Sequence, residues 1–138
     1  MAEIFAPTGY TIALKDVPFI TAGPYKAQWV QWAGHAMAVE VAPPGWPANP
    51  DTDVLWDGLP ESRCQCAHYG YVTGGRALMR LGDGSEHMLN KGDLYYCPPG
   101  HRVYSLDGFE NIEFNPDLDA ALAAMASFER NARRAEES

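Results

Sequence analysis

The chain has 138 residues, of which 46% are apolar and 20% charged, and its formal net charge at pH 7 is −8. This length fits one domain with its own core, and the negative charge argues against a nucleic-acid partner, because such binding depends on lysine and arginine. The 3 cysteines cannot form a closed disulfide set, no apolar run is long enough to cross a membrane, and the first residues carry no export signal. We therefore expect a cytoplasmic protein without nucleic-acid or membrane partners.

The N-terminal third contains two strand-like segments after an irregular start. Residues 1–24 hold several prolines and glycines and one short apolar piece, which predicts an N-terminal arm or edge strand. Residues 25–32 and 35–41 are rich in aromatic and β-branched residues and are predicted as strands.

A long segment, residues 42–59, follows these strands. Its prolines and glycines exclude a helix or a central strand. A loop of this length is either a lid over a functional site or a surface crossing that Trp46 and Trp56 hold to the core.

Strand signals then recur at the regular spacing of an all-β sandwich or barrel. The tight turn Gly82-Asp83-Gly84-Ser85 supports a hairpin, since glycine adopts positive φ without a steric penalty. The predicted strands cover residues 64–73, 76–81, 86–89, 94–97, 101–106 and 109–114.

Residues 116–134 are predicted to form a C-terminal helix. Asn115 can cap it, and Leu118, Leu122 and Met125 form an apolar stripe at helical spacing. We expect this stripe to pack on an outer sheet face or on a dimer partner.

Metal-capable side chains gather in two blocks. Cys64, Cys66 and His68 occupy every second position of a predicted strand and would share one face. His101 follows a turn about thirty residues later, and this turn can aim it at the cavity or at solvent. Imidazole and thiolate are common metal ligands, yet cysteine is also often plainly buried, and a histidine can be hydrogen-bonded without metal.

The two blocks resemble the two motifs of the cupin superfamily. Residues 71–75 match the strand-then-glycine close of the first motif, and Gly92 with Pro98-Pro99-Gly100 matches the second. The resemblance implies an all-β fold, a jelly-roll β-barrel over residues 25–114, inside a single domain of residues 1–138. It also implies a divalent metal ion between the motifs, with zinc, iron, copper or manganese as the candidates.

The sequence departs from the family pattern at the ligand positions. The place of the family's glutamate falls at His68, that of its second histidine at Cys64, and that of its earlier histidine at Ser62. In the second motif the family histidine's place is Val103, whereas His101 directly follows the glycine. The predicted ligand set is therefore His68, His101, Cys64 and Cys66.

Three further residues have weaker claims on the site. His35 lies on a strand that cupins place beside the first motif and could reach the cavity. Cys97 is expected to pack in the core, and His87, next to a turn, is expected at the surface.

Without the family's glutamate, a proton-transfer group must come from elsewhere. Glu113 and Glu110 lie on the last predicted strand, although either carboxylate could simply face solvent. Hydroxyl donors could come from Tyr69, Tyr71, Tyr96 and Tyr104. We take Glu113 and Tyr71 as the catalytic candidates.

Substrate contacts are expected from aromatic and cationic side chains around the cavity. Trp46 and Trp56 could form its roof, and Tyr96 could contact a ring. Arg76 could bind a carboxylate in a bidentate way, although an arginine at this spacing can also line an outer sheet surface.

As a functional prediction, the resemblance favours a metal-dependent enzyme of lyase, isomerase or oxygenase type that acts on a small organic acid or aromatic, as a homodimer. The alternative is a non-catalytic cupin that binds or senses a small ligand or a metal. A barrel without metal, whose cysteines and histidines only pack, stays open as a third reading.

Overall fold

The computed structural model describes residues 4–47 and 54–137, with side chains as far as Arg134. No helix in these residues is both long and apolar enough to cross a membrane. Along the chain the elements are η1 (Leu14–Asp16), β1 (Phe19–Ala22), β2 (Tyr25–Trp32), β3 (His35–Ala42), η2 (Pro60–Ser62), β4 (His68–Gly74), β5 (Arg76–Arg80), β6 (Glu86–Asn90), β7 (Leu94–Cys97), β8 (Arg102–Ser105), β9 (Phe109–Asn115) and α1 (Leu118–Glu137).

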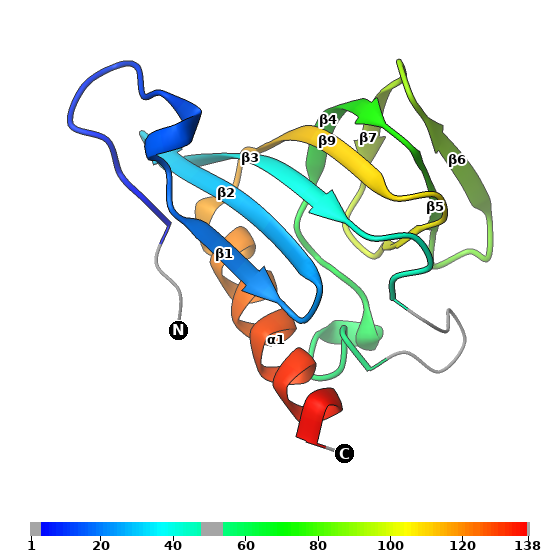
Figure 1. Ribbon diagram of the computed structural model, residues 1–138. Coiled ribbons are helices and arrows are strands. Elements are labelled where there is room, and N and C mark those ends of the chain that lie inside the picture. The colour runs from blue at the N-terminus through cyan, green and yellow to red at the C-terminus, as the bar shows by residue number, and fades with distance from the viewer. Residues whose placement is uncertain (1–3, 48–53, 138) are drawn as a thin grey trace.

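The strands form two antiparallel sheets (Figure 1). The larger sheet has six strands in the order β1-β2-β3-β9-β4-β7, and the smaller has three in the order β6-β5-β8. Strands far apart in sequence, such as β3, β9 and β4, are therefore direct neighbours. The predicted all-β architecture with a C-terminal helix is confirmed.

The central strand β9 faces the interior with polar side chains. Its burial alternates strictly, so Asn111, Glu113 and Asn115 point inward while Ile112 and Phe114 point outward. This reverses the usual pattern of apolar residues inside and polar residues outside. An inward polar row at the centre of a sheet makes this face of β9 a candidate for a functional site.

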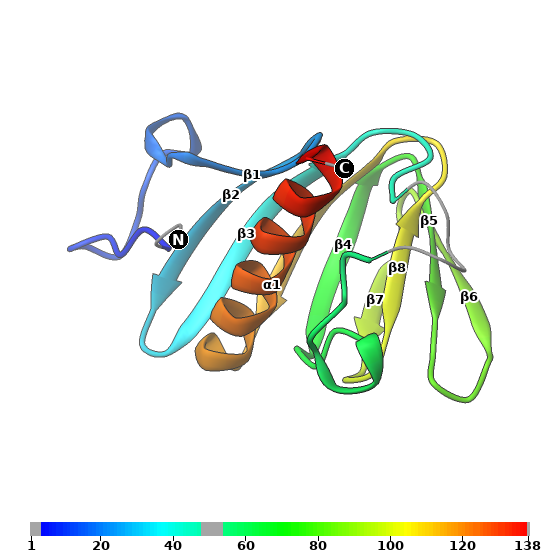
Figure 2. The same cartoon turned by 90° about the horizontal axis from the view of Figure 1, so that it is seen from below.

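The prediction that α1 packs on an outer sheet face or a dimer partner is wrong. The helix lies beneath β1, β2 and β3, on the side of the sheet that faces the interior (Figures 1 and 2). Small residues such as Ala121 and Ala124 let it approach closely, and Met125 joins Trp56 and Cys64 in one hydrophobic cluster. The helix thereby forms one wall of the cavity.

The described ends of the segment 42–59 are tied to the barrel by their tryptophans. Trp46 bridges to Ser105 and stacks on Tyr25 with ring centroids 5.5 Å apart. Trp56 is buried and makes edge contacts with Tyr104 and Phe128. The predicted lid falls partly on residues 48–53, which lie outside the described residues.

The edge strand predicted within residues 1–24 is present as β1, which pairs residues 19–22 with β2. The largest difference from the predicted strands is at the first metal-capable block. The strand expected from Cys64 begins only at His68, and Cys64 makes an isolated antiparallel bridge with His101 instead.

Candidate metal centre

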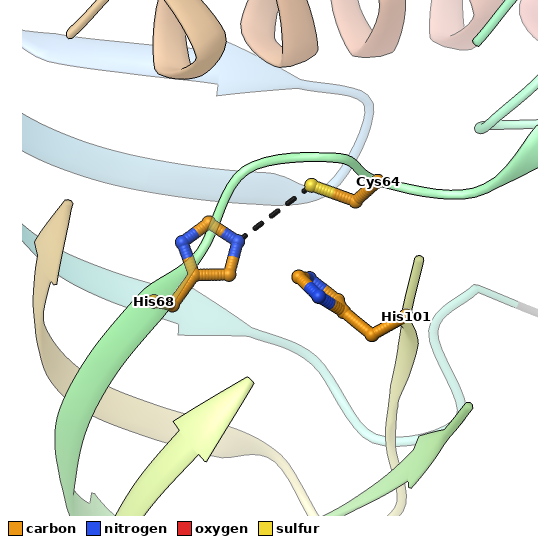
Figure 3. A group of neighbouring side chains, drawn as sticks. All are labelled: Cys64, His68 and His101. Atoms are coloured by element: carbon orange, nitrogen blue, oxygen red, sulfur yellow. Dashed lines mark hydrogen bonds between the residues drawn. The ribbon is translucent and has the colours of Figure 1, made fainter. Parts of the chain in front are cut away.

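Cys64, His68 and His101 each offer one ligand atom, and these atoms all lie within 4.8 Å of one another. Figure 3 shows the side chains of Cys64 and His68, from one stretch of the chain, converging with that of His101 from another. The Sγ of Cys64 lies 3.6 Å from Nε2 of His68, and the two imidazole rings have centroids 4.8 Å apart. A single ion could contact all three.

Backbone pairing holds Cys64 against His101. The Cys64 amide donates to the carbonyl of His101 at 2.9 Å, and the amides of Gly100 and His101 donate to the carbonyl of Cys64 at 2.8 and 3.3 Å. Gly100 has a φ of 90°, a conformation that a side chain would strain. The turn therefore directs His101 inward, where it is only 2% exposed.

Each imidazole has its Nδ1 engaged by oxygen, which leaves Nε2 for a metal. Nδ1 of His101 donates to the carbonyl of Pro98 at 2.6 Å. Nδ1 of His68 donates to Oδ1 of Asn115 and also lies 3.3 Å from the Glu113 carboxylate. Oxygen partners of this kind orient histidine ligands in metal sites and raise their basicity.

The local electrostatics favour a thiolate at Cys64. Burial alone would raise its pKa, but hydrogen bonds with His101 and His68 outweigh burial and lower that pKa from 9.0 to about 5. Burial also acts to lower the pKa of His68, yet Glu113 and the neighbouring sulfurs raise it well above its ordinary value. Without metal, an imidazolium would balance the thiolate.

The other two cysteines lie in different surroundings. Burial raises the pKa of Cys66, and its thiol donates to Oδ1 of Asn115 at 3.5 Å. Burial raises the pKa of Cys97 to about 12. Cys66 thus lies behind His68 and outside the three-residue group, because the chain from Cys64 to His68 does not run as one regular strand.

The centre opens onto an internal cavity. Apart from the three candidate ligands, its wall is mostly apolar and aromatic, and both Trp46 and Trp56 belong to it. Glu113 also lines the cavity, where Tyr95 donates a hydrogen bond to its Oε1 at 3.1 Å.

The sequence prediction missed a hydrogen-bonded group of polar residues in this wall. Glu40, Tyr25, Asn111 and Tyr95 all line the cavity and are joined by hydrogen bonds. Alternation along β7 would have shown Tyr95 to share the inward face of Cys97. Tyr95 also needs the glycine opposite it, because a Cβ on Gly70 would overlap the tyrosine ring.

Three predicted site residues lie away from the cavity. Tyr71 and Tyr96 are 44% and 48% exposed, since strand alternation turns them to the outer face of the large sheet. Arg76 pairs with Asp107 at the surface, and both side chains are half exposed.

The weaker candidates are also placed by the strand pattern. His35 is exposed and stacks on Phe114 on the outer face. His87 is exposed beside Ser85, and Glu110 faces outward on β9.

The donor set fits a transition metal. One thiolate and two imidazoles match zinc sites with three protein ligands, in which a fourth position stays open to water or substrate. Copper and iron accept the same donors, whereas manganese prefers oxygen ligands.

No protein-family model matches the chain, and no curated protein matches it in sequence. Several solved structures share its fold. The Fe(II) form of HppE aligns at a TM-score of 0.56 and 13% identity over 78% of this chain, which spans only 60% of that chain. An RmlC-like cupin from Shewanella frigidimarina NCIMB 400 aligns at a TM-score of 0.56 and 14% identity. This alignment covers 78% of the present chain and 90% of the cupin chain.

A third structure is oxalate decarboxylase from Lactobacillus farciminis in complex with formate. It aligns at a TM-score of 0.53 and 17% identity over 80% of this chain and 35% of its own. At such identities the likeness shows the fold alone. The chain thus has the jelly-roll barrel of the cupins, as the sequence resemblance implied.

Proposed function

We propose that this chain is a metal-dependent cupin enzyme of lyase, isomerase or oxygenase type that acts on a small organic molecule. Cys64, His68 and His101 hold one divalent ion and leave a coordination position open toward the cavity. The observation that carries this proposal is the convergence of three ligand atoms within 4.8 Å at the wall of an apolar cavity.

The donor set narrows the metal to zinc, iron or copper. A bound ion would supply Lewis acidity or redox chemistry at the open position. Asn115 and Pro98 provide the oxygens that keep each Nε2 free for it. Cys66 holds Asn115 in place as a neutral thiol.

Glu113 is the group best placed to hold or move a proton. Burial and the neighbouring Glu40 raise the pKa of its carboxyl group well above the ordinary range. Its Oε2 lies 3.3 Å from His68, while its Oε1 accepts a hydrogen bond from Tyr95. Tyr95 therefore takes the role of hydroxyl partner that the sequence had suggested for Tyr71.

Metal analysis tests the site directly. In protein purified under reducing conditions, we expect near-stoichiometric zinc, iron or copper by elemental analysis. His68→Ala and His101→Ala should each lower metal affinity by at least about tenfold, because each removes a ligand. The matched control is His87→Ala, since His87 is exposed and lies beside Ser85 at the surface, away from the three candidate ligands.

Two outcomes would contradict the proposed metal site. One is wild-type protein that neither carries metal nor takes it up on reconstitution. The other is equal metal loss in His68→Ala and His87→Ala.

The coordination number of the bound metal distinguishes the proposed enzyme from the non-catalytic alternative. In cobalt-substituted protein, visible absorption bands that shift when small ligands are added would show an open position. Bands that do not respond, together with loss of metal in Cys66→Ser, would show a closed site and favour a binding or sensing role. A Glu113→Gln variant that keeps its metal but loses turnover would establish the enzyme.

We also propose a reducing, cytoplasmic location. All three cysteines are buried and unpaired, and a thiolate ligand at Cys64 requires a reduced sulfur. Cell fractionation that recovers the protein in an oxidising compartment, with cysteines that no longer react as free thiols, would overturn the proposed location.

A further inference from the structure

One end of the cavity is an acidic hydrogen-bond network built on four strands. Glu40 of β3 lies directly opposite Asn111 of β9, and Asn111 donates to its Oε1 at 3.1 Å. Tyr25 of β2 donates to the other oxygen of Glu40. Tyr95 of β7 donates to Glu113 at 3.1 Å. We call these five residues the acidic network.

The hydrogens of the network's tyrosines and asparagine are already used within it, and a proton held by Glu113 is shared with Glu40. The hydroxyls of Tyr25 and Tyr95 each donate to a carboxylate, and the Nδ2 of Asn111 donates to Glu40 and, at 2.5 Å, to the oxygen of Tyr95. An acceptor is left over, however. The Oδ1 of Asn111 is buried without a hydrogen-bond partner, in a residue that is 1% exposed and lines the cavity.

A buried acceptor without a partner costs free energy unless a ligand or water supplies a donor. The network therefore needs an O–H or N–H group from whatever occupies the cavity. A ligand that brings only acceptors would leave Asn111 unsatisfied.

In the metal-free protein the imidazolium of His68 is already balanced by the Cys64 thiolate and the Glu113 carboxyl group, and the cavity offers no further cation among the described residues for a ligand's acid group. No lysine or arginine is among the described residues that line it, and residues 1–3, 48–53 and 135–138 contain neither. Arg102 stacks on Trp56 but is not a lining residue, and its Nε donates to the Ser62 carbonyl at 2.9 Å. The two carboxyl groups of the acidic network, Glu40 and Glu113, therefore disfavour an anionic ligand at this end of the cavity.

The rest of the wall suits a flat apolar body. Trp29, Trp46, Trp56, Phe109 and Phe128 all line the cavity, and Trp46 is already stacked on Tyr25. Aromatic side chains prefer stacked or edge contacts with other rings, so they select an aromatic ligand over a small aliphatic acid.

We propose that the cavity binds an aromatic molecule that carries a hydroxyl or amino group and no acid group, with this donor hydrogen-bonded to Asn111 and Glu40. The proposal rests on the proposed function, which places the reacting part of the ligand at Cys64, His68 and His101. Of the two substrate classes that the sequence suggested, it selects the aromatic and rejects the organic acid.

The test compares four probes of one size: benzyl alcohol, benzylamine, toluene and benzoate. Their affinities for the full-length protein are measured by ligand-observed NMR and by quenching of tryptophan fluorescence, both as purified and after metal removal with a chelator. In the metal-free protein we expect benzyl alcohol and benzylamine to bind at least about tenfold more tightly than benzoate and toluene. The ratio between the first two shows which donor the network prefers.

A variant links the selectivity to the network. Glu40→Gln replaces an acceptor oxygen with a donor of the same shape, so the preference for the alcohol and the amine should fall by about tenfold. Glu110→Gln is the matched control, because Glu110 faces outward on the same strand as Asn111. Thermal unfolding of each variant confirms that its fold is intact.

Benzoate that binds the metal-free protein as tightly as benzyl alcohol would overturn the inference, as would a complete lack of binding by all four probes. A selectivity that persists in Glu40→Gln would overturn it too. The ratio of affinities for the four probes is measured on the wild-type protein without metal, so it does not depend on any variant or on metal binding. If the protein proves to carry no metal but keeps this ratio, the proposed function fails while the ligand class stands.

Discussion

The three cysteines are all nearly inaccessible, yet each sulfur meets a different partner. Cys64 faces two imidazoles, Cys66 an amide oxygen, and Cys97 packs in a hydrophobic cluster. A thiolate is the form that binds metal, so the partner decides which sulfur can be a ligand. Spacing in the sequence could not separate the three, because each is a cysteine on or near a predicted strand.

Titration of the metal-free protein should reveal one thiolate. The lowered pKa of Cys64 means that its thiolate persists at neutral pH and is lost as the pH falls through about 5. The raised pKa of Cys66 and the value of about 12 for Cys97 mean that little more thiolate forms up to pH 9. Absorbance near 240 nm measures this directly.

Cys64→Ser should abolish the acidic transition, and Cys97→Ser should leave it in place. A single transition above pH 8 in the wild-type protein would show that the imidazoles do not stabilise the thiolate.

Asn115 is a positioning residue rather than a ligand. Its Oδ1 accepts from Nδ1 of His68 and thereby selects the tautomer that presents Nε2. We expect Asn115→Ala to weaken metal binding by about 10- to 100-fold without removing any ligand. Competition with a chelating dye measures the affinity, and Asn90→Ala, at the end of an outer strand, is the control.

A purely structural role would lower stability in Asn115→Ala but leave the metal affinity of the folded protein unchanged. Recovery of affinity in Asn115→Asp, which restores the acceptor oxygen, would support positioning.

At the scale of elements, most strands were predictable and their contacts were not. β2, β3, β6, β7 and β9 lie within a residue or two of their predicted bounds, because alternating side chains between glycine and proline turns carry that information locally. Which strands pair, and which face of each is inside, depends on partners far along the chain. Strand alternation places Tyr95 on the same face as Cys97, so a buried Cys97 would have indicated Tyr95 rather than Tyr96 as the inward residue. The two adjacent tyrosines alone do not show which of them faces inward.

The position of α1 was mispredicted for a related reason. Its apolar stripe is visible in the sequence, but the stripe does not say which surface receives it. The deciding feature is a polar residue: Asn131 is buried and donates to the carbonyls of Leu55 at 2.8 Å and Asp57 at 2.9 Å. These bonds fix the helix to the segment that carries Trp56.

Asn131→Ala should therefore destabilise the whole fold. The carbonyls of Leu55 and Asp57 each lose a hydrogen bond from the helix, which predicts a loss of about 2 kcal/mol in the free energy of unfolding. Urea unfolding followed by circular dichroism measures it. Arg134→Ala, on an exposed position of the same helix, should change stability by less than about 0.5 kcal/mol. Equal effects of the two substitutions would refute the anchoring role.

At the scale of the whole molecule, the outer face of the large sheet is unusually apolar. Cross-strand pairing aligns two rows across β3, β9, β4 and β7, and six of their eight residues are 39–49% exposed, while Leu94 is 82% exposed. The rows are Met37, Phe114, Tyr69 and Tyr96, and Val39, Ile112, Tyr71 and Leu94. We call these eight residues the outer apolar face.

An exposed apolar face of this kind is typical of an interaction surface. It contains no charged residue, whereas the chain as a whole carries a net charge of −8. Two copies can therefore meet here without bringing like charges together. The same four strands carry His68 and four of the five residues of the acidic network on their inner side, so pairing across this face would also stiffen the site.

We therefore expect the homodimer to form through the outer apolar face. A stable interface of this type buries about 1,600 Å² in total. Light scattering coupled to size exclusion should give twice the chain mass of 15.2 kDa for the wild-type protein. Leu94→Glu should shift the equilibrium to the monomer, because the two-fold relation would place a new carboxylate on each side of the interface.

Leu14→Glu is the control, since Leu14 is 47% exposed in η1 and lies outside the face. A wild-type protein at monomer mass, or equal effects of the two substitutions, would contradict this interface. If the dimer and its metal content both fall in Leu94→Glu while the fold persists, then pairing across the outer side of β4, β7 and β9 supports the metal centre on their inner side.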